Sequence, residues 1–334
     1  MTMPEAIRLA ADWRGADLQD RSDLWQHQLT GAEIDELGRA IAQVRALGKE
    51  LRQVTASDFP LVTLAPSLAD WLTRLERGLG FVLLRGFPVH EWSKQDAAIA
   101  YWIIGRHLGE PVSQNTAGEV HVDVRDTGTS ASDHNNRLYR TRAELSFHTD
   151  GADIIGLQCL RAARSGGVSR ICSSVHVYNE VLQRRPDLAP LMFDTYQHHA
   201  HGQFGANGPK TFPYPIVTLH GGTFRMFLLP WYIRNAAEDF PDTASLSAPQ
   251  RELLDLLEAI PREPGDDRGV RKEDWHAVVD RARFRGQLQT QEGSQVLRLA
   301  PGLWCHAQIL QRALHDHRPA RKPCDSLSTG RNRA

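Results

Sequence analysis

Short apolar runs separated by turn residues constrain the fold of this 334-residue chain more than any other feature. The runs cover residues 153–160, 169–174, 216–219 and 223–229. Each run has the length of an ordinary strand and is too short for an ordinary helix. Short strands divided by turns in this way are typical of a β-barrel or a jelly roll.

Helices are expected around these strands. Within residues 31–45, Ile34, Leu37 and Ile41 recur at spacings of three and four, which places them on one apolar face of a helix. The same reasoning predicts helices at residues 67–76, 94–108, 175–183 and 248–260, and a buried strand at residues 81–84. The polar residues 116–136 show little periodicity, so we expect a long loop there.

The charge balance disfavours two classes of partner. The chain has 39 Lys and Arg against 40 Asp and Glu, a net charge of -1. Such a chain has no positive field that would attract nucleic acid or an anionic membrane surface. We therefore expect a small-molecule partner, and the sequence leaves a homo-oligomer open.

Cysteine usage and hydropathy favour the cytoplasm. The 4 cysteines are scattered, without a disulfide framework or a C-x-x-C pair. The longest apolar run, residues 78–84, is far shorter than the roughly 20 residues that span a bilayer. The first 15 residues also lack the apolar core of a signal peptide.

The tripeptide His148-Thr149-Asp150 is the sharpest chemical signal in the chain. If this segment is extended, side chains two residues apart point to the same side, so an imidazole and a carboxylate converge. One His and one carboxylate, joined by a second His from later in the chain, form the facial triad of non-haem Fe(II) sites. The motif therefore predicts an iron site.

Four separated motifs carry a resemblance to a known family. They are GLGFVLLRGFP at 78–88, LGEPVSQN at 108–115, AELSFHTDGAD at 143–153 and RSGGVS at 164–169. In this order they resemble the taurine dioxygenase (TauD/TfdA-like) family of Fe(II)- and 2-oxoglutarate-dependent oxygenases. The resemblance covers roughly residues 30–260.

The resemblance implies an α+β fold, a double-stranded β-helix (jelly roll, clavaminate synthase-like) decorated with helices. It implies Fe(II), the cosubstrate 2-oxoglutarate and O2, which together oxidise an unactivated C–H bond of a small polar molecule. His148 and Asp150 match the first two iron ligands. Ser169 matches a hydroxyl that binds the cosubstrate, although a turn residue that satisfies its own backbone is an equal alternative.

The third iron ligand and the cosubstrate clamp are less well defined, because the resemblance weakens in the last third of the chain. His276 is the candidate for the distal His. An alignment that takes Glu273 and Asp274 as the acidic turn instead puts this position near Arg285 and leaves no third protein ligand. Arg298, in the QVLRL segment that resembles the final strand, is the candidate clamp. The alternatives are His306, His315 and His317 for the ligand and Arg283 and Arg285 for the clamp.

Each of the remaining candidate residues has both a functional and a structural interpretation. Asn115 and Arg142 lie on matched motifs and are candidate substrate contacts, with a solvent-exposed charge as the alternative for Arg142. The tract with His198, His199 and His201 is Gly-rich up to Lys210 and is expected to be a surface connection, with pocket lining as the alternative. Trp231, Tyr232 and Arg234 are expected to pack in the core, with contact to the pocket as the alternative.

The expected organisation is an N-terminal extension at 1–30, the oxygenase domain at 31–300 and a divergent tail at 301–334. The expected function is that of a cytoplasmic 2-oxoglutarate-dependent dioxygenase. The alternative is a non-catalytic descendant of the fold that binds a metabolite or a partner. A complete set of three protein ligands for iron distinguishes the two hypotheses.

Overall fold

The computed structural model describes residues 4–115, 117–128, 130, 144–161, 169–205, 207–220, 223–270, 277–281 and 294–300. These residues belong to one compact unit, Met1–Leu303. Of the residues singled out above, Arg142, His276, Arg283, Arg285 and the three tail histidines lie outside the described residues.

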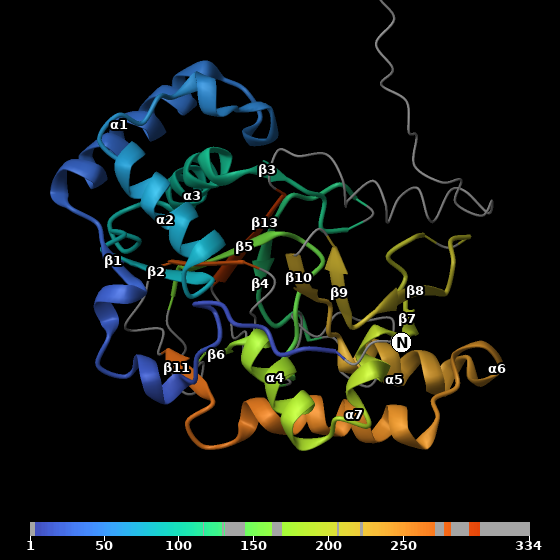
Figure 1. Cartoon of the computed structure of the whole chain (residues 1–334). Coiled ribbons are helices and arrows are strands. Elements are labelled where there is room, and N and C mark those ends of the chain that lie inside the picture. Colours follow the sequence, from blue (N-terminus) through green and yellow to red (C-terminus); the bar gives the residue numbers. More distant parts are fainter. Residues whose placement is uncertain are drawn as a thin grey trace, which may run out of the picture. The chain divides into compact units, whose positions relative to one another are not determined.

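A seven-stranded sheet forms the centre of this unit (Figure 1). The order is β1-β2-β12-β5-β13-β3, with β4 paired to β13, and only the β1–β2 pair is parallel among these pairings. Strands β12 and β13 flank β5, so the end of the domain supplies central strands. The bounds are β1 Gln26–Gln28, β2 Phe81–Arg85, β3 Glu110–Pro111, β4 His121–Val124, β5 Ile154–Cys159, β12 Ala277–Arg281 and β13 Ser294–Ala300.

Three two-stranded sheets accompany the large sheet, and all three are antiparallel. The strands expected at residues 153–160, 169–174, 216–219 and 223–229 are confirmed, the last one ending before Phe227. The pairs are β6 Ser169–Cys172 with β11 Asp267–Val270, β7 Thr195–His199 with β8 Thr211–Pro215, and β9 Val217–His220 with β10 Thr223–Met226.

The expectation of a continuous loop at residues 116–136 is wrong at β4. This strand is short, and it forms because Val122 and its neighbours pair with β13 far along the chain. Val122 pairs with Val296, about a hundred and seventy residues later in the chain. Local periodicity cannot predict a strand that depends on so distant a partner.

Helices α1 to α3 pack on one side of the sheet (Figure 1). Thr30 begins α1 with a capping box, in which its hydroxyl accepts from the Glu33 N–H and its own N–H donates to the Glu33 carboxylate. Ser93 caps α3 in the simpler way, and Gly109 ends it. The three helices run over α1 Gly31–Leu47, α2 Ala65–Arg77 and α3 Lys94–Leu108, as their sequence periodicity predicted.

The remaining helices pack together and cover the smaller sheets (Figure 1). They share a core with β9 and β10 that includes Tyr178, Phe224 and Leu253. The α-helices are α4 Ser174–Arg184, α5 Pro230–Asp239, α6 Pro241–Ala244 and α7 Ala248–Ala259. The short 3-10 helices are Gly15–Leu18, Ser22–Leu24, Leu51–Gln53, Ala56–Asp58, Ala189–Phe193 and Ile260–Arg262.

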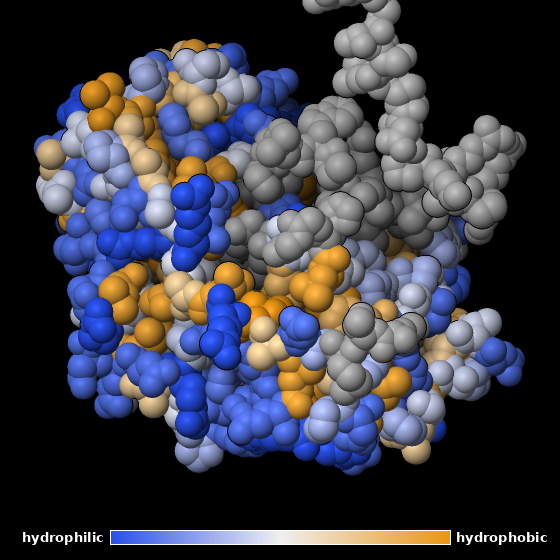
Figure 2. All heavy atoms as spheres, in the orientation of Figure 1, coloured by the Kyte–Doolittle hydropathy of each residue, from blue (hydrophilic) through white to orange (hydrophobic). Residues whose placement is uncertain are grey.

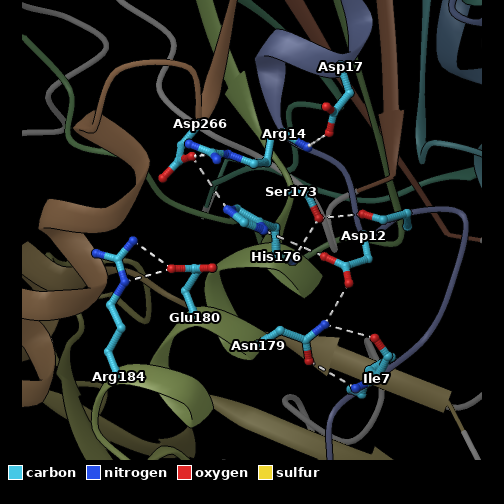
Figure 3. Close-up of polar contacts among 11 residues, drawn as sticks. Ile7, Asp12, Arg14, Asp17, Ser173, His176, Asn179, Glu180, Arg184 and Asp266 are labelled. Atoms are coloured by element: carbon cyan, nitrogen blue, oxygen red, sulfur yellow. Dashed lines mark hydrogen bonds and ion pairs between the residues drawn. The ribbon is translucent and has the colours of Figure 1, made fainter.

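The N-terminal segment is bound to α4 by polar side chains (Figure 3). Asn179 accepts from the Ile7 N–H at 2.9 Å and donates to the Ile7 carbonyl at 2.8 Å. The His176 ring lies between Asp12, 3.6 Å from its Nδ1, and Asp266, 3.5 Å from its Nε2. Arg14 donates to the same Asp266 carboxylate at 2.7 Å. Residues expected as an N-terminal extension are thus tied into the fold next to β11.

The surface and the helices give no sign of a membrane span among the described residues. None of the helices in this part of the chain is long and apolar enough to cross a bilayer. On the face shown in Figure 2, hydrophilic residues make up most of the coloured surface.

Helix α3 packs tightly against the sheet at Gly156 in β5. A Cβ atom added there would lie 2.9 Å from Tyr101 Cζ, and Tyr101 is 2% exposed. Because a buried ring cannot move aside, we predict that Gly156→Ala lowers the free energy of unfolding by about 1–3 kcal/mol. Chemical denaturation measures this change.

Gly38 in α1 is the matched control, because an added Cβ there meets nothing within 4 Å. Gly38→Ala should raise the free energy of unfolding by about 0.5–1 kcal/mol, since Gly is unfavourable inside a helix. Equal stability of Gly156→Ala and the parent would show that α3 does not press on β5 as described.

Candidate functional site

The His148-Thr149-Asp150 segment lies outside regular strands and is separated from β5 by Gly151, Ala152 and Asp153. It is held instead by Thr149, which is 1% exposed. The Thr149 N–H donates to the Leu228 carbonyl at 2.9 Å, and the Leu228 N–H donates to Thr149 Oγ1 at 2.7 Å. The residues on either side of Thr149 are thereby fixed against the segment that leads into α5.

The His148 ring is oriented for a ligand. Its Nδ1 lies 2.8 Å from the Ser146 carbonyl oxygen. Because a carbonyl only accepts, Nδ1 carries the proton, and Nε2 presents its lone pair. Trp231, at the start of α5, packs edge-on against the ring at a centroid distance of 4.9 Å. A metal-binding His typically has this arrangement, with the second nitrogen bonded to a carbonyl.

The donors at this site fit iron in type. An imidazole nitrogen and the half-buried carboxylate of Asp150 are the donors of the Fe(II) facial triad. Within the described residues, no group of three or more His, Cys, Asp or Glu is arranged to hold a metal ion. Since His276 lies outside those residues, the described part of the chain supplies two donors of the expected three.

Ser169 opens β6 and is 1% exposed. Its Oγ has no hydrogen-bond partner among the residues that the structure describes, so the alternative of a turn hydroxyl bonded to its own backbone is not supported. An unpaired buried hydroxyl is unfavourable by about 1–3 kcal/mol, and a ligand carboxylate would remove that cost. Ser169 pairs with Val270, the last residue of β11.

The other candidates occupy different places. Arg298 is on β13 opposite Ile155 of β5, and Ile155 comes five residues after Asp150 in the sequence. The Asn115 side chain serves its own loop, because its Oδ1 accepts from the N–H groups of Ala117 at 3.0 Å and Glu119 at 3.2 Å. Its Nδ2 donates to the Glu119 carboxylate, so both ends of the amide are engaged within that loop.

The expectation that the His198 tract is a surface connection is wrong for its histidines. His198, His199 and His201 are 0%, 6% and 6% exposed. Phe212 and Phe227 cover His198, with ring centroids at 5.1 Å and 5.2 Å. The sequence missed this burial because the covering rings come from two other segments of the chain.

His198 is a neutral imidazole. Burial lowers its pKa to about 4, although hydrogen bonding to the Tyr196 and Phe212 backbone acts in the opposite direction. Nδ1 lies 3.2 Å from the Tyr196 carbonyl and therefore carries the proton. Nε2 has no hydrogen-bond partner among the described residues. His198 thus has the same tautomer as His148.

A series of rings links the histidine tract to His148. His201 packs on Tyr232 at 4.1 Å, Tyr232 contacts Trp231 at 5.5 Å, and Trp231 contacts His148. Gln203 donates to the Tyr232 hydroxyl at 2.9 Å. The expectation of core packing is therefore incomplete for Trp231 and Tyr232, because Trp231 reaches the candidate metal site. Arg234 is turned away and pairs with Asp255 and Glu258.

Comparison with protein families identifies the family of this chain. Residues 43–268 match the model of the taurine catabolism dioxygenase TauD, TfdA family. The chain belongs to this family. Its members are Fe(II)- and 2-oxoglutarate-dependent oxygenases, so the chain is an enzyme of this class, a dioxygenase that oxidises a small molecule. The comparisons support the enzyme and give no sign of the non-catalytic alternative.

Two curated proteins are similar to this chain. FR-33289 synthase of Streptomyces rubellomurinus is 28% identical over 266 residues, which cover 78% of this chain and 77% of that protein. Taurine hydroxylase-like protein SAT17 of Stachybotrys chartarum is 28% identical over 250 residues, which cover 70% of this chain and 62% of that protein.

Solved structures share the fold. An asparagine oxygenase in complex with Fe(II), 3-hydroxyasparagine and succinate has a TM-score of 0.62 at 16% identity, covering 83% of this chain and 93% of its own. The non-haem iron oxygenase OrfP in complex with iron and α-ketoglutaric acid has a TM-score of 0.55 at 16% identity, covering 83% and 95%. At these identities the likeness supports the fold, a mixed helix and strand architecture.

The Thr149–Leu228 contact yields a stability prediction. Thr149→Val removes the acceptor of the buried Leu228 N–H at nearly constant volume, so the free energy of unfolding should fall by about 1–3 kcal/mol. Thr149→Ser keeps the acceptor and should lose less. Urea denaturation compares the two variants directly, and a Thr149→Val protein as stable as the parent would show that the hydroxyl contributes nothing.

Proposed function

We propose that this dioxygenase holds Fe(II) through His148, Asp150 and His276. The hydrogen bond of His148 Nδ1–H to the Ser146 carbonyl, which orients the ring, is the observation that carries the proposal. His276 lies in the chain just before β12, the strand that pairs with β5. Three protein donors on one face would leave three coordination positions for the cosubstrate and oxygen.

Ser169 and Arg298 are proposed to bind 2-oxoglutarate. The buried, unpaired hydroxyl of Ser169 supports a hydrogen bond to a carboxylate oxygen. An Arg is suited to the far carboxylate because its guanidinium meets the two oxygens in a bidentate contact. The position of Arg298 opposite Ile155 supports this role, since Ile155 follows the proposed ligands closely in sequence.

Bound iron, with 2-oxoglutarate and O2, supplies the oxidising power of the reaction. The protein contributes geometry and the exclusion of water. The Ser146 carbonyl holds the His148 ring, and Thr149 anchors the ligand segment to Leu228. Trp231 covers one side of the His148 ring, which keeps water from that side.

The finer architecture is proposed as a double-stranded β-helix. The seven-stranded sheet would form one wall, and the β6–β11 and β9–β10 pairs would belong to the other. The support is that the ligand segment precedes β5 of the large sheet closely in sequence and is hydrogen-bonded through Thr149 to Leu228, which follows β10.

The proposed substrate is a small polar or zwitterionic molecule in the cytoplasm. An asparagine oxygenase and OrfP, which share the fold, have been solved with 3-hydroxyasparagine and with L-Arg. Both compounds are amino acids. Arg142 and Asn115 remain predicted substrate contacts, and Asn115 would have to give up its loop hydrogen bonds to take part.

The iron site gives a direct prediction. His148→Ala and Asp150→Ala should each abolish stoichiometric Fe(II) binding, measured by anaerobic calorimetry, and the formation of succinate from 2-oxoglutarate. His276→Ala should behave in the same way with an unchanged melting midpoint of the metal-free protein. His90→Ala is the matched control, because its side chain is 75% exposed and should leave both properties unchanged.

Each outcome decides between the assignments. Iron binding at the level of the parent in His148→Ala or Asp150→Ala would contradict the site itself. Full activity in His276→Ala would transfer the third ligand to another His, with His306 tested next. A parent protein that forms no succinate with iron and ascorbate would favour the non-catalytic alternative.

The cosubstrate clamp can be tested separately. Arg298→Ala should weaken 2-oxoglutarate binding by about 2–5 kcal/mol if the ion pair is buried, and Arg298→Lys should recover part of this. Competition with a fluorescent or isotopically labelled 2-oxoglutarate measures the affinity. Unchanged affinity would move the role to Arg283 or Arg285.

A further inference from the structure

Two segments next to the candidate iron site run antiparallel to each other. Their contacts pair His148 with Trp231, Thr149 with Leu228, and Asp153 with Arg225. Between the last two pairs, a Cβ atom added to Gly151 would lie 3.6 Å from Phe227. The segment from Arg225 to Trp231 therefore runs alongside the segment from His148 to Asp153, in the opposite direction.

Arg225 and Asp153 form a loose ion pair at one end of this alignment. Their closest nitrogen and oxygen atoms are 3.8 Å apart, beyond hydrogen-bond distance, and their side chains are 29% and 20% exposed. In the described part of the chain, the Arg225 guanidinium makes no hydrogen bond. Asp153 is three residues after Asp150, so the pair is within about 10 Å of the proposed iron ligand along an extended chain.

Tyr214 and Phe227 complete the surroundings of this pair. The two rings contact each other edge-on at 5.1 Å, and Phe227 also packs on the buried His198. The Tyr214 hydroxyl makes no hydrogen bond within the described residues. Burial raises the Tyr214 pKa, while Arg225 acts to lower it and Asp153 to raise it, which places both charges near the ring. The guanidinium of Arg225 and the carboxylate of Asp153 therefore lie near the hydroxyl-bearing ring of Tyr214, which packs on Phe227.

We infer that Arg225 and Asp153 are specificity-determining residues that bind an amino acid-type zwitterion as the substrate. Arg225 takes the acidic group, Asp153 takes the ammonium group, and the Tyr214 hydroxyl bonds to the acidic group. The inference rests on the proposed function, since it names the substrate class of the same site.

The charge arrangement selects a zwitterion over a singly charged molecule. A simple anion would draw Arg225 away from Asp153 and leave a half-buried carboxylate without its partner, which is unfavourable. A zwitterion instead replaces one long contact with two charge-assisted hydrogen bonds, each stronger than a neutral one. The guanidinium suits a carboxylate or a sulfonate, because it offers paired donors in one plane.

The test uses the full chain loaded with Fe(II) and 2-oxoglutarate without oxygen, and measures binding by calorimetry. The probes are L-asparagine, L-arginine and taurine, with L-argininamide and N-acetyl-L-arginine as partners of L-arginine that lack one charge. At least one zwitterion should bind. The amide of the best probe lacks its negative charge, and the N-acetyl compound lacks its positive charge. Each should bind at least about tenfold more weakly than the zwitterion, which is typical of the loss of one charge-assisted hydrogen bond.

The variants separate recognition from a structural role. Arg225→Gln should lose the preference for the acid over the amide but keep the preference for the free amine. Asp153→Asn should show the reverse pattern. A merely structural pair would change the melting midpoint and leave both preferences intact. Arg21→Gln is the matched control, because Arg21 forms a similar pair with Asp23 at 3.5 Å in the N-terminal segment.

Three results overturn the inference: no zwitterion of the panel binds, binding ignores the charge of the probe, or Arg225→Gln and Asp153→Asn keep both preferences. The proposed function has its own readout, since iron and 2-oxoglutarate binding to the parent are measured in the same experiment. If the parent fails to bind these two, the proposed function fails. If it binds both and no zwitterion, only the substrate class is wrong.

Discussion

The pairing of β5 on both edges is the constraint on which the rest of the structure depends. All six residues of β5 are buried, so their N–H and C=O groups must find partners in other strands. The partners are β12 and β13, both from the end of the domain. The sheet can therefore be completed only when β12 and β13 have joined, because β12 lies between β2 and β5.

The proposed site depends on the same pairing. His148 and Asp150 lie shortly before β5 in the sequence, and Arg298 lies opposite β5 on β13. Ser169 opens β6, whose partner β11 leads the chain toward β12. The N-terminal segment and α4 both support β11, because Arg14 and His176 each contact Asp266 next to it (Figure 3). The residues proposed to bind iron and 2-oxoglutarate therefore come from distant parts of the sequence.

The polar groups of the site are prepared for ligands by contacts within the protein. His148 and His198 each donate Nδ1–H to a nearby carbonyl, which fixes the orientation of each ring. Burial keeps His198 neutral, so it adds no positive charge beside the proposed substrate groups. Charge near the ligand segment comes instead from Arg225 and Asp153, which nearly balance each other. Such a site favours a ligand that carries both charges.

The sequence by itself determined the local elements and the chemistry of the ligand motif. Helices α1 and α3 follow from apolar spacing and caps, and His148 with Asp150 follows from residue type and order. Only the tertiary structure decided that β4 is a strand, that the His198 tract is buried, and that Trp231 covers His148. The physical reason is that periodicity records which face of a segment is apolar, whereas the partner of that face comes from residues far away in the chain.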